Sequence, residues 1–426
     1  MKTALVDRVH RIFANLGPGL ITGAADDDPS GISTYSVAGA MFGFQMLWTA
    51  VFSFPLMTAV QLMCGRLGMV TGLGLAGAIR TYYSRKILWF ACLLLITANI
   101  VNIAADLGGM ADVTELLTGV SSSLWTPVFT VLILALLIFT TYRTIVRIFK
   151  WLTLALLAYV VSAFLAQPDW LAVAKATLVP TFSWTPQYWA TLVGILGTTI
   201  SPYLFFWGAA QEVEVDISKG RVNLEDRRGA TPEELRSLRN DVTSGMFFSN
   251  LVMFFIILTS SATLHANGNT NIATARQAAE ALRPLAGDGA FLLFSFGLIG
   301  AGMLGVPVLA GSCAYAISEA AGWAGSLDAK PKHAIGFYVV IGLAMSIGLW
   351  LDFANFDAVK MLFWAAVLNG VLAPPLLVLV VLLTSREDVM GEHRNGFTLR
   401  SLGWLCAALM FIATLVMFAS VLLPLA

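Results

Sequence analysis

Long apolar runs alternate with short polar segments along almost the whole chain. Each run has roughly the length that an α-helix needs to cross a bilayer, about 20 residues. The eleven runs cover residues 17–43, 46–70, 87–118, 124–141, 146–167, 187–213, 241–264, 288–316, 334–351, 356–383 and 401–424. This pattern predicts an all-α polytopic membrane protein with eleven transmembrane helices, embedded in a lipid bilayer.

The first run contains a polar break. Its residues are Asp26, Asp27, Asp28, Pro29, Ser30 and Gly31. Pro29 lacks an N–H and clashes with the preceding turn, and Gly31 relaxes the backbone, so a continuous helix is not expected here. A carboxylate at mid-bilayer costs on the order of 3 kcal/mol. Three in a row therefore indicate a water-filled or ion-binding site, since broken backbone at membrane depth must be buried in protein or line a wet cavity.

The sixth run contains a second break, at Pro202. Hydroxyl side chains precede and tyrosine follows this proline; the residues are Thr198, Thr199, Ser201 and Tyr203. Two interrupted helices at corresponding places in two five-span halves are typical of an inverted-repeat transporter with its site between them. We therefore expect one transport domain over residues 1–426, with repeats at 17–167 and 187–383 and an extra helix at 401–424.

Other polar residues fall inside apolar runs. Asp106 is the deepest acid of the third run and shares a helix face with Asn102. By the same cost argument Asp106 is a candidate for the transport pathway, although a helix–helix hydrogen bond is also open. Asn250 and Asn369 are buried amides, and Glu212 lies two turns or more past the second break, where it could line an inner vestibule.

The distribution of Lys and Arg predicts the orientation in the membrane, and the composition argues against a nucleic-acid-binding protein or an enzyme. With a cytoplasmic N-terminus, the inner segments hold 21 Lys and Arg and the outer segments three, apart from Lys360 at the edge of the tenth run. This asymmetry predicts a multi-pass protein of the plasma (inner) membrane with its C-terminus outside. A net charge of zero, with 12% charged residues, suggests no nucleic-acid partner. There is no nucleophile–base constellation, so we expect no enzyme, and no cofactor.

Together these features resemble the NRAMP family of divalent-metal transporters. The resemblance covers nearly the whole chain, from Gly17-Pro-Gly19 to the eleventh run, and includes Asp106-Leu107 and the stretch Leu382–Gly391. It implies a LeuT-like fold of inverted five-helix repeats with discontinuous helices 1 and 6. At the first break the chain has Asp28-Pro29-Ser30-Gly31 where the family has Asp-Pro-Gly-Asn.

The resemblance carries over residue by residue. Asp28 matches the family's metal-binding aspartate, whereas its ligand asparagine falls at Gly31. The family's Met-Pro-His at the second break reads Ser201-Pro202-Tyr203 here, and Asn369 lies where the family often has a glutamine that contacts the ion. One principal side-chain ligand therefore remains.

An oxygen-only ligand set favours a hard cation, because thioethers select softer metals. The chain in this respect resembles the magnesium-transporting NRAMP-related branch. We hypothesise a monomeric importer of Mg²⁺, or of Mn²⁺, that works by alternating access. Asp28 would be the direct ligand and Asp27 and Asp26 outer charges, with Ser30, Ser201 and Asn369 as polar contacts or water holders. Asp106, Thr198, Thr199, Tyr203, Glu212 and Asn250 would line the pathway.

An alternative function stays open at this point. On the same scaffold the chain could carry a small carboxylate or amino-acid derivative coupled to H⁺ or Na⁺. Ser30 and Gly31 would then offer N–H groups to the anion at the start of the second half-helix, and the aspartates would bind the coupling ion.

Thermal-shift titration separates the two hypotheses. A cation transporter is expected to be stabilised by Mg²⁺ or Mn²⁺, since a ligand that binds only the native state raises the melting temperature. Stabilisation by organic acids without any response to divalent cations would favour the alternative.

Overall fold

The computed structural model describes residues 22–23, 25–141, 144–145, 148, 154–272, 274–323, 325–327, 329, 331–353 and 357–422. The predicted motif Gly17-Pro-Gly19 and the first half of the fifth apolar run lie outside the described residues. Within the described part every regular element is helical, with no β-strand. The prediction of an all-α protein is confirmed.

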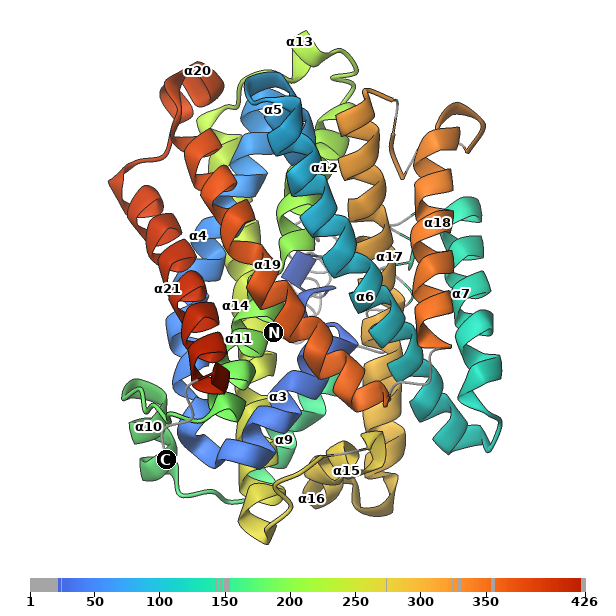
Figure 1. Cartoon of the computed structure of the whole chain (residues 1–426), viewed down its shortest axis with the longest axis vertical. Helices are drawn as coiled ribbons and strands as arrows, with labels where there is room; N and C mark the ends of the chain where they lie inside the picture. The colour runs from blue at the N-terminus through green and yellow to red at the C-terminus, as the bar shows by residue number, and fades with distance from the viewer. Residues whose placement is uncertain are drawn as a thin grey trace, which may run out of the picture.

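The elements follow the predicted order along the chain (Figure 1). The helices are α3 Pro29–Phe42, α4 Trp48–Thr71, α5 Leu75–Tyr82, α6 Arg85–Thr118, α7 Ser122–Phe139, α9 Ala158–Leu165, α10 Trp170–Leu178, α11 Pro186–Thr199, α12 Pro202–Ser218, α13 Leu224–Arg227, α14 Pro232–Thr263, α15 Ala275–Ala279, α16 Arg283–Ala286, α17 Ala290–Ala321, α18 Ile335–Asp352, α19 Ala358–Ser385, α20 Glu387–Met390 and α21 Phe397–Leu422. Short 3₁₀ turns join several of them.

Nine helical segments in the described part are long and apolar enough to cross a membrane, counting α11 with α12 as one. The first and fifth predicted spans are not among them. The first is divided by its polar break, so that α3 alone has 14 residues. The fifth is represented by a short apolar helix over 155–165, because the residues before it lie outside the description.

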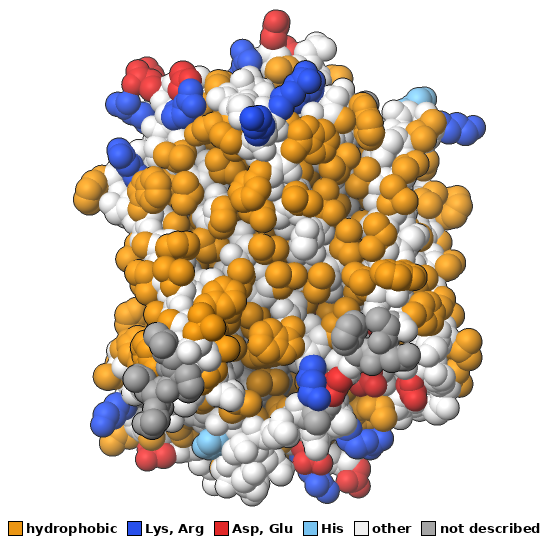
Figure 2. Space-filling model, viewed as in Figure 1, with side chains coloured by type: hydrophobic (Ala, Val, Ile, Leu, Met, Phe, Trp, Pro, Cys, Tyr) orange, Lys and Arg blue, Asp and Glu red, His pale blue; other side chains and the backbone are white. Residues whose placement is uncertain are grey.

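The surface has an apolar belt between two charged ends (Figure 2). Large apolar side chains such as Val131 on α7 and Trp350 on α18 are 65% and 72% exposed, as expected for side chains that face lipid. The charged connections around α5, α13 and α20 lie at one end, and α10, α15 and α16 lie at the other (Figure 1). Loops that the charge pattern assigns to one side therefore meet at one end.

Both predicted breaks are present, and each is followed by a proline that begins a helix. Asp28 is extended, with φ −70° and ψ 170°, and α3 begins at Pro29. Ile200 and Ser201 leave helical geometry between α11 and α12, and α12 begins at Pro202. Proline suits the first position of a helix, where its missing N–H is not needed. The discontinuous helices 1 and 6 are confirmed.

Two local features differ from what short sequence signals alone indicate. Thr231 is followed by a proline and two glutamates, which indicate the start of a short surface helix, whereas the structure has Thr231 as the cap of α14, a helix of 32 residues that continues into the seventh span. The capping box between Thr231 and Glu234 is present as expected. A helix distortion is also expected at Pro374-Pro375, yet α19 runs through both residues. Neighbouring helices in membranes can satisfy the backbone groups that proline leaves free.

The first half of the sixth span packs directly against α19. A Cβ added at Gly197 would lie 2.2 Å from the carbonyl oxygen of Ala366 and 2.2 Å from the amide nitrogen of Gly370. A Cβ added at Gly370 would lie 2.3 Å from the carbonyl oxygen of Val193. Only glycine permits this close approach, which is the way that small residues bring membrane helices together.

Replacement of Gly197 by alanine is therefore expected to destabilise the protein. The new methyl group meets backbone rather than a mobile side chain, and overpacking of this kind costs about 1–3 kcal/mol. The check is the melting temperature of the purified protein in detergent. Gly342→Ala on α18 is the matched control, since an added Cβ there meets nothing within 4 Å, and its melting temperature should not fall. Equal melting temperatures for both variants would contradict the packing argument.

Candidate functional site

Asp28 lies at the first helix break with four hydrogen-bond donors around its carboxylate. Its Oδ1 accepts from the Ser30 hydroxyl at 2.6 Å and from the Gly31 N–H at 2.8 Å. Its Oδ2 accepts from Asn102 Nδ2 at 2.8 Å and from the Tyr203 hydroxyl at 3.3 Å. The side chain is 1% exposed. Residues from α3, α6 and α12 thus converge on one carboxylate, and Tyr203 connects the two helix breaks.

A second buried amide extends this arrangement to the tenth span. Asn369 Nδ2 on α19 donates to Asn102 Oδ1 on α6 at 3.4 Å, a long hydrogen bond. Both side chains are fully buried. No donor in the described part of the chain reaches Asn369 Oδ1. The structure therefore places the predicted Asn369 two hydrogen bonds away from Asp28, on the far side of Asn102.

The three consecutive aspartates divide between two sets of partners: Asp26 and Asp27 share one hydroxyl, and Asp28 has other contacts. Asp26 Oδ2 accepts from the hydroxyl of Ser249 on α14 at 2.5 Å, and Asp27 Oδ1 lies 3.3 Å from the same hydroxyl. Both carboxylates are buried, at 0% and 4% exposure. Asp28 faces α6 and α12 instead. Because the helix ends between Asp26 and Pro29, adjacent side chains are free to diverge in this way.

Asp106 is buried, and neither carboxylate oxygen accepts a hydrogen bond of normal geometry from the described residues; the Ser30 N–H is the donor that interacts with it. It lies one turn after Asn102 on α6, as predicted from the spacing. Asp26 Oδ1 and Thr198 Oγ1 are also buried without a partner in the described part. Buried polar atoms in proteins are almost always paired, so such a cluster around two helix breaks indicates a place for a polar ligand.

The hydroxyl groups at the second break mainly donate hydrogen bonds to carbonyl groups of the same segment. Ser201 donates to the carbonyls of Gly197 and Thr198, at 3.0 and 2.6 Å, and Thr199 donates to the carbonyl of Ile195 at 2.7 Å. The carbonyls of Gly197 and Thr198 belong to the end of α11, where the break removes the helical donors. The structure thus shows Ser201 and Thr199 in backbone hydrogen bonds rather than in contact with Asp28.

Gly31 allows the two breaks to approach closely. A Cβ built at Gly31 would lie 2.9 Å from Thr198 Oγ1 and 3.6 Å from Asp28 Oδ1. Gly305 on α17 has a similar place on the other side, where an added Cβ would lie 3.0 Å from Asp28 Cβ. The absence of a side chain at position 31 is therefore a requirement of packing in this conformation.

Two of the residues predicted for the pathway have neighbours other than Asp28. Asn250 Nδ2 contacts Met57 Sδ at 2.6 Å and Asn250 Oδ1 accepts from Ser53, so this amide joins α14 to α4. Glu212 is 6% exposed and lines a cavity of about 10 Å³ with Thr22, among other residues. A cavity of that size holds about one water molecule. Neither side chain has a hydrogen bond to Asp28 within the described residues.

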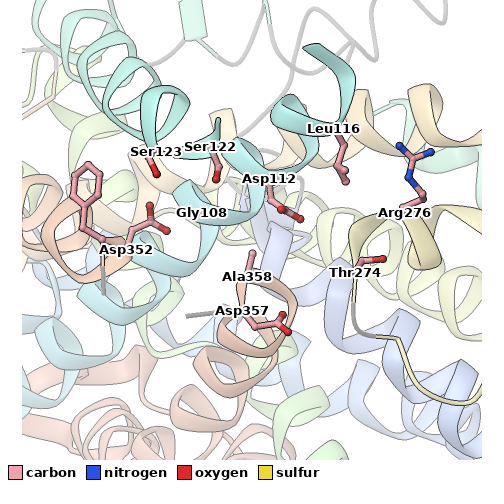
Figure 3. A pocket seen from close by; sticks show the side chains of 11 residues that line it. Gly108, Asp112, Leu116, Ser122, Ser123, Thr274, Arg276, Asp352, Asp357 and Ala358 are labelled. Carbon is pink, nitrogen blue, oxygen red and sulfur yellow. The ribbon is translucent and has the colours of Figure 1, made fainter. Parts of the chain in front are cut away.

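A larger polar cavity of about 590 Å³ lies beside the C-terminal part of α6 (Figure 3). Asp112, Asp352 and Asp357 lie around it with Arg276, and Gly108, two residues after Asp106, is part of its wall. Asp352 and Asp357 come from the ends of α18 and α19, and the sequence reading did not single them out. Each is a single acid next to the end of a predicted span, a position that gives no signal of a site.

The electrostatics of the centre are dominated by negative charge. Asp26, Asp27, Asp28 and Asp106 are all at least 96% buried. Among the ion pairs of the described residues, none joins these carboxylates to a Lys, Arg or His. An unpaired buried charge costs several kcal/mol, so such groups either take up protons or bind cations. The arrangement can therefore hold positive charge.

The direct contact between Asn102 and Asp28 was not predicted from the sequence. It placed Asn102 on one helix face with Asp106 but gave it no role at the site. The sequence shows an amide one helical turn before a buried acid. This spacing indicates that one face of the helix is polar, but it does not indicate which residue of another helix that face contacts. The partner is 74 residues away in the chain.

Comparisons with known proteins agree with this geometry. A family model described as "Natural resistance-associated macrophage protein-like" (Nramp) matches residues 19–420. A protein of Klebsiella pneumoniae subsp. pneumoniae named "Divalent metal cation transporter MntH" is 27% identical over 412 residues, which are 93% of this chain and 92% of that protein.

Solved structures show the same fold. The Eremococcus coleocola manganese transporter, in complex with an aromatic bis-isothiourea substituted compound, superposes with a TM-score of 0.71 at 21% identity, covering 94% of this chain and 85% of that one. Mhp1, a nucleobase-cation-symport-1 family transporter, has a TM-score of 0.55 at 15% identity and covers 96% and 91%. The second likeness shows that the fold is shared with LeuT-type transporters.

The close approach of Gly31 and Thr198 gives a test of the site. Gly31→Ala is expected to lower the melting temperature, because its methyl group meets Thr198 Oγ1, and Thr198→Ala added to it should restore part of the loss. Residues in contact show coupling of about 0.5–3 kcal/mol in such a double-mutant cycle. Thr199→Ala is the matched control, since its hydroxyl faces its own helix, and its effect should simply add. Additive effects for Gly31 and Thr198 would contradict the contact.

Proposed function

The chain belongs to the Nramp family, and from this membership we propose that it transports a divalent metal cation across the membrane by alternating access, with Mg²⁺ as the preferred cargo and Mn²⁺ as a second. The observation that carries the proposal is the group of four buried aspartates around the two helix breaks, with no cationic side chain paired to them in the described part. A dication that enters this centre supplies the missing positive charge.

The ligand chemistry supports a hard cation. The side chains that contact Asp28 belong to a serine, an asparagine and a tyrosine. The atom with which each of them can bind a metal ion is an oxygen. Ser201 and Tyr203 stand where the family resemblance places methionine and histidine. In the described part, no group of three or more His, Cys, Asp or Glu converges to form a metal cage. Mg²⁺ suits such a site, because it binds through one or two carboxylates and keeps several waters.

The relatives are consistent with cargo from the same chemical class. The Klebsiella protein is named for divalent metal cations and the Eremococcus protein for manganese. In our proposal this chain shares the scaffold and the aspartate at position 28. It differs in the neutral groups around the ion, which are the groups that discriminate hard from softer metals.

The organic-solute alternative loses its expected donors in this conformation. It needs the N–H groups at the start of α3 for an anion, yet the Gly31 N–H and the Ser30 hydroxyl both donate to Asp28 Oδ1. An anion would also lie next to the buried carboxylates, which repel it. We therefore prefer the cation.

The proposal includes the location of the protein, its orientation in the membrane and the parts that move. We place the protein in the plasma (inner) membrane as a monomer, with its N-terminus in the cytoplasm and its C-terminus outside. The repeats at 17–167 and 187–383 would rock against each other around the site, with 401–424 as an added helix. The cavity lined by Asp112, Asp352 and Asp357 would then be the outer vestibule, where negative charge concentrates cations.

Asp28→Asn is expected to abolish or severely reduce Mg²⁺ uptake into proteoliposomes. The amide keeps the shape of the side chain but removes the charge that binds the ion, and the loss should be at least on the order of 10- to 100-fold, the range seen for weaker perturbations of metal sites. Asp288→Asn, which changes an exposed carboxylate, is the matched control and should transport normally.

Competition in the same assay tests the choice of cargo. Unlabelled Mg²⁺ and Mn²⁺ should both reduce uptake, with Mg²⁺ effective at the lower concentration, whereas small organic acids should not. Uptake that persists in Asp28→Asn would refute the cation site, and competition by organic acids alone would favour the alternative.

A further inference from the structure

The amide of Asn102 lies at the point where a cation bound by Asp28 would need a further oxygen. Its Nδ2 lies 2.8 Å from Asp28 Oδ2, and its Oδ1 accepts from Asn369 at 3.4 Å. Both amides are fully buried between α6 and α19. In this arrangement Asn102 is a donor toward Asp28, which suits a carboxylate without a cation.

A half-turn of the Asn102 amide exchanges its donor and its acceptor in place. The NH₂ and the oxygen of an asparagine occupy nearly the same volume, and the hydrogen-bond network decides which one points where. After the turn Oδ1 would lie about 2.8 Å from Asp28 Oδ2. Two oxygens at that distance repel each other unless a cation or a proton lies between them.

The distance matches an octahedral dication. Mg²⁺ binds oxygen at 2.0–2.1 Å, so neighbouring ligands at right angles are about 2.9 Å apart. The turned Asn102 Oδ1 and Asp28 Oδ2 would thus have the spacing of one edge of a Mg²⁺ coordination shell. Water molecules and other oxygens of the site would complete the shell.

Asn369 makes the turned state possible. In the observed arrangement its Nδ2 donates to Asn102, while no donor in the described residues reaches its own Oδ1. If Asn102 turns, its Nδ2 faces Asn369, and a matching turn of Asn369 presents Oδ1 to receive it. The pair therefore has two arrangements that are each joined by one hydrogen bond: the first leaves Asn369 Oδ1 without a partner, and the second leaves Asn369 Nδ2 in that place.

We propose that Asn102 is a ligand of the transported dication, which turns its amide oxygen to the ion when the ion binds Asp28 while Asn369 turns with it. This inference rests on the proposed function, because it assumes a cation at Asp28. It makes Asn102 a determinant of hard-cation binding, since an amide oxygen suits Mg²⁺ better than it suits softer metals.

The test is Mg²⁺ binding to the purified protein, measured by calorimetry, for two substitutions that separate ligand from donor. Asn102→Leu has neither function and should bind at least 10-fold more weakly. An ionised Asn102→Asp can only accept, so it should bind as well as the unchanged protein or more tightly if position 102 supplies an oxygen. If Asn102 acts only as a donor that positions Asp28, Asn102→Asp should be as weak as Asn102→Leu, and that result would overturn the proposal.

Asn99→Leu is the matched control. Asn99 lies on the same helix, is fully buried and donates to the carbonyl of Leu309 on α17. Its loss removes a buried amide from α6 without touching Asp28, so Mg²⁺ affinity should be unchanged. A drop equal to that of Asn102→Leu would show that the helix, rather than the ligand, is responsible, and would overturn the assignment.

A spectroscopic readout keeps the proposal independent of affinity. With Mn²⁺ as the probe at saturating concentration, protein labelled with ¹³C at the asparagine amide carbon should show a coupling between the metal and that carbon in pulsed EPR. Asn102→Asp should retain bound Mn²⁺ and lose the coupling. Bound Mn²⁺ without a coupling in the unchanged protein would refute Asn102 as a ligand, whereas undiminished binding in Asp28→Asn would instead refute the cation site on which the inference rests.

Discussion

Negative charge without a counter-ion is the constraint on which this structure depends. Four aspartates are removed from water near two helix breaks, and no Lys, Arg or His of the described residues pairs with them. Stability and function are then coupled, because without a cation each of these buried carboxylates needs hydrogen-bond donors or a proton. Asp28 receives four such donors from three helices. An ion can bind its carboxylate only where one of these donors moves away or turns.

The broken helices supply these donors and the space. At the first break Asp28 caps α3, so that the carboxylate is held by the helix it begins. At the second break Ser201 satisfies carbonyls of α11, and Tyr203 reaches across to Asp28. Glycines at positions 31 and 305 let the side chains of Thr198 and Asp28 come close. The site is therefore made by close packing around a few polar groups rather than by a preformed cage.

Much of this arrangement was predictable, because proline and acidic residues inside apolar runs are strong local signals. They located both breaks, Asp28, Asp106 and the order of the spans. Three-dimensional partners were less accessible: the polar face of Asn102 was predicted but not its contact with Asp28, and Asn250 was predicted to be buried but not to contact α4. Such contacts depend on how helices rotate about their axes, which hydropathy does not determine. The continuous course of α19 through Pro374-Pro375 likewise depends on its neighbours.

The contact between Gly197 and α19 has a consequence for how the protein can move. Backbone that touches backbone leaves no layer of side chains to shear, so α11 and α19 are expected to travel as one rigid unit. Motion of the sixth span must then be absorbed in the two non-helical residues Ile200 and Ser201. The hinge of that span is thus confined to a single short joint beside the charged centre, where a small change in backbone torsion swings the whole of α12.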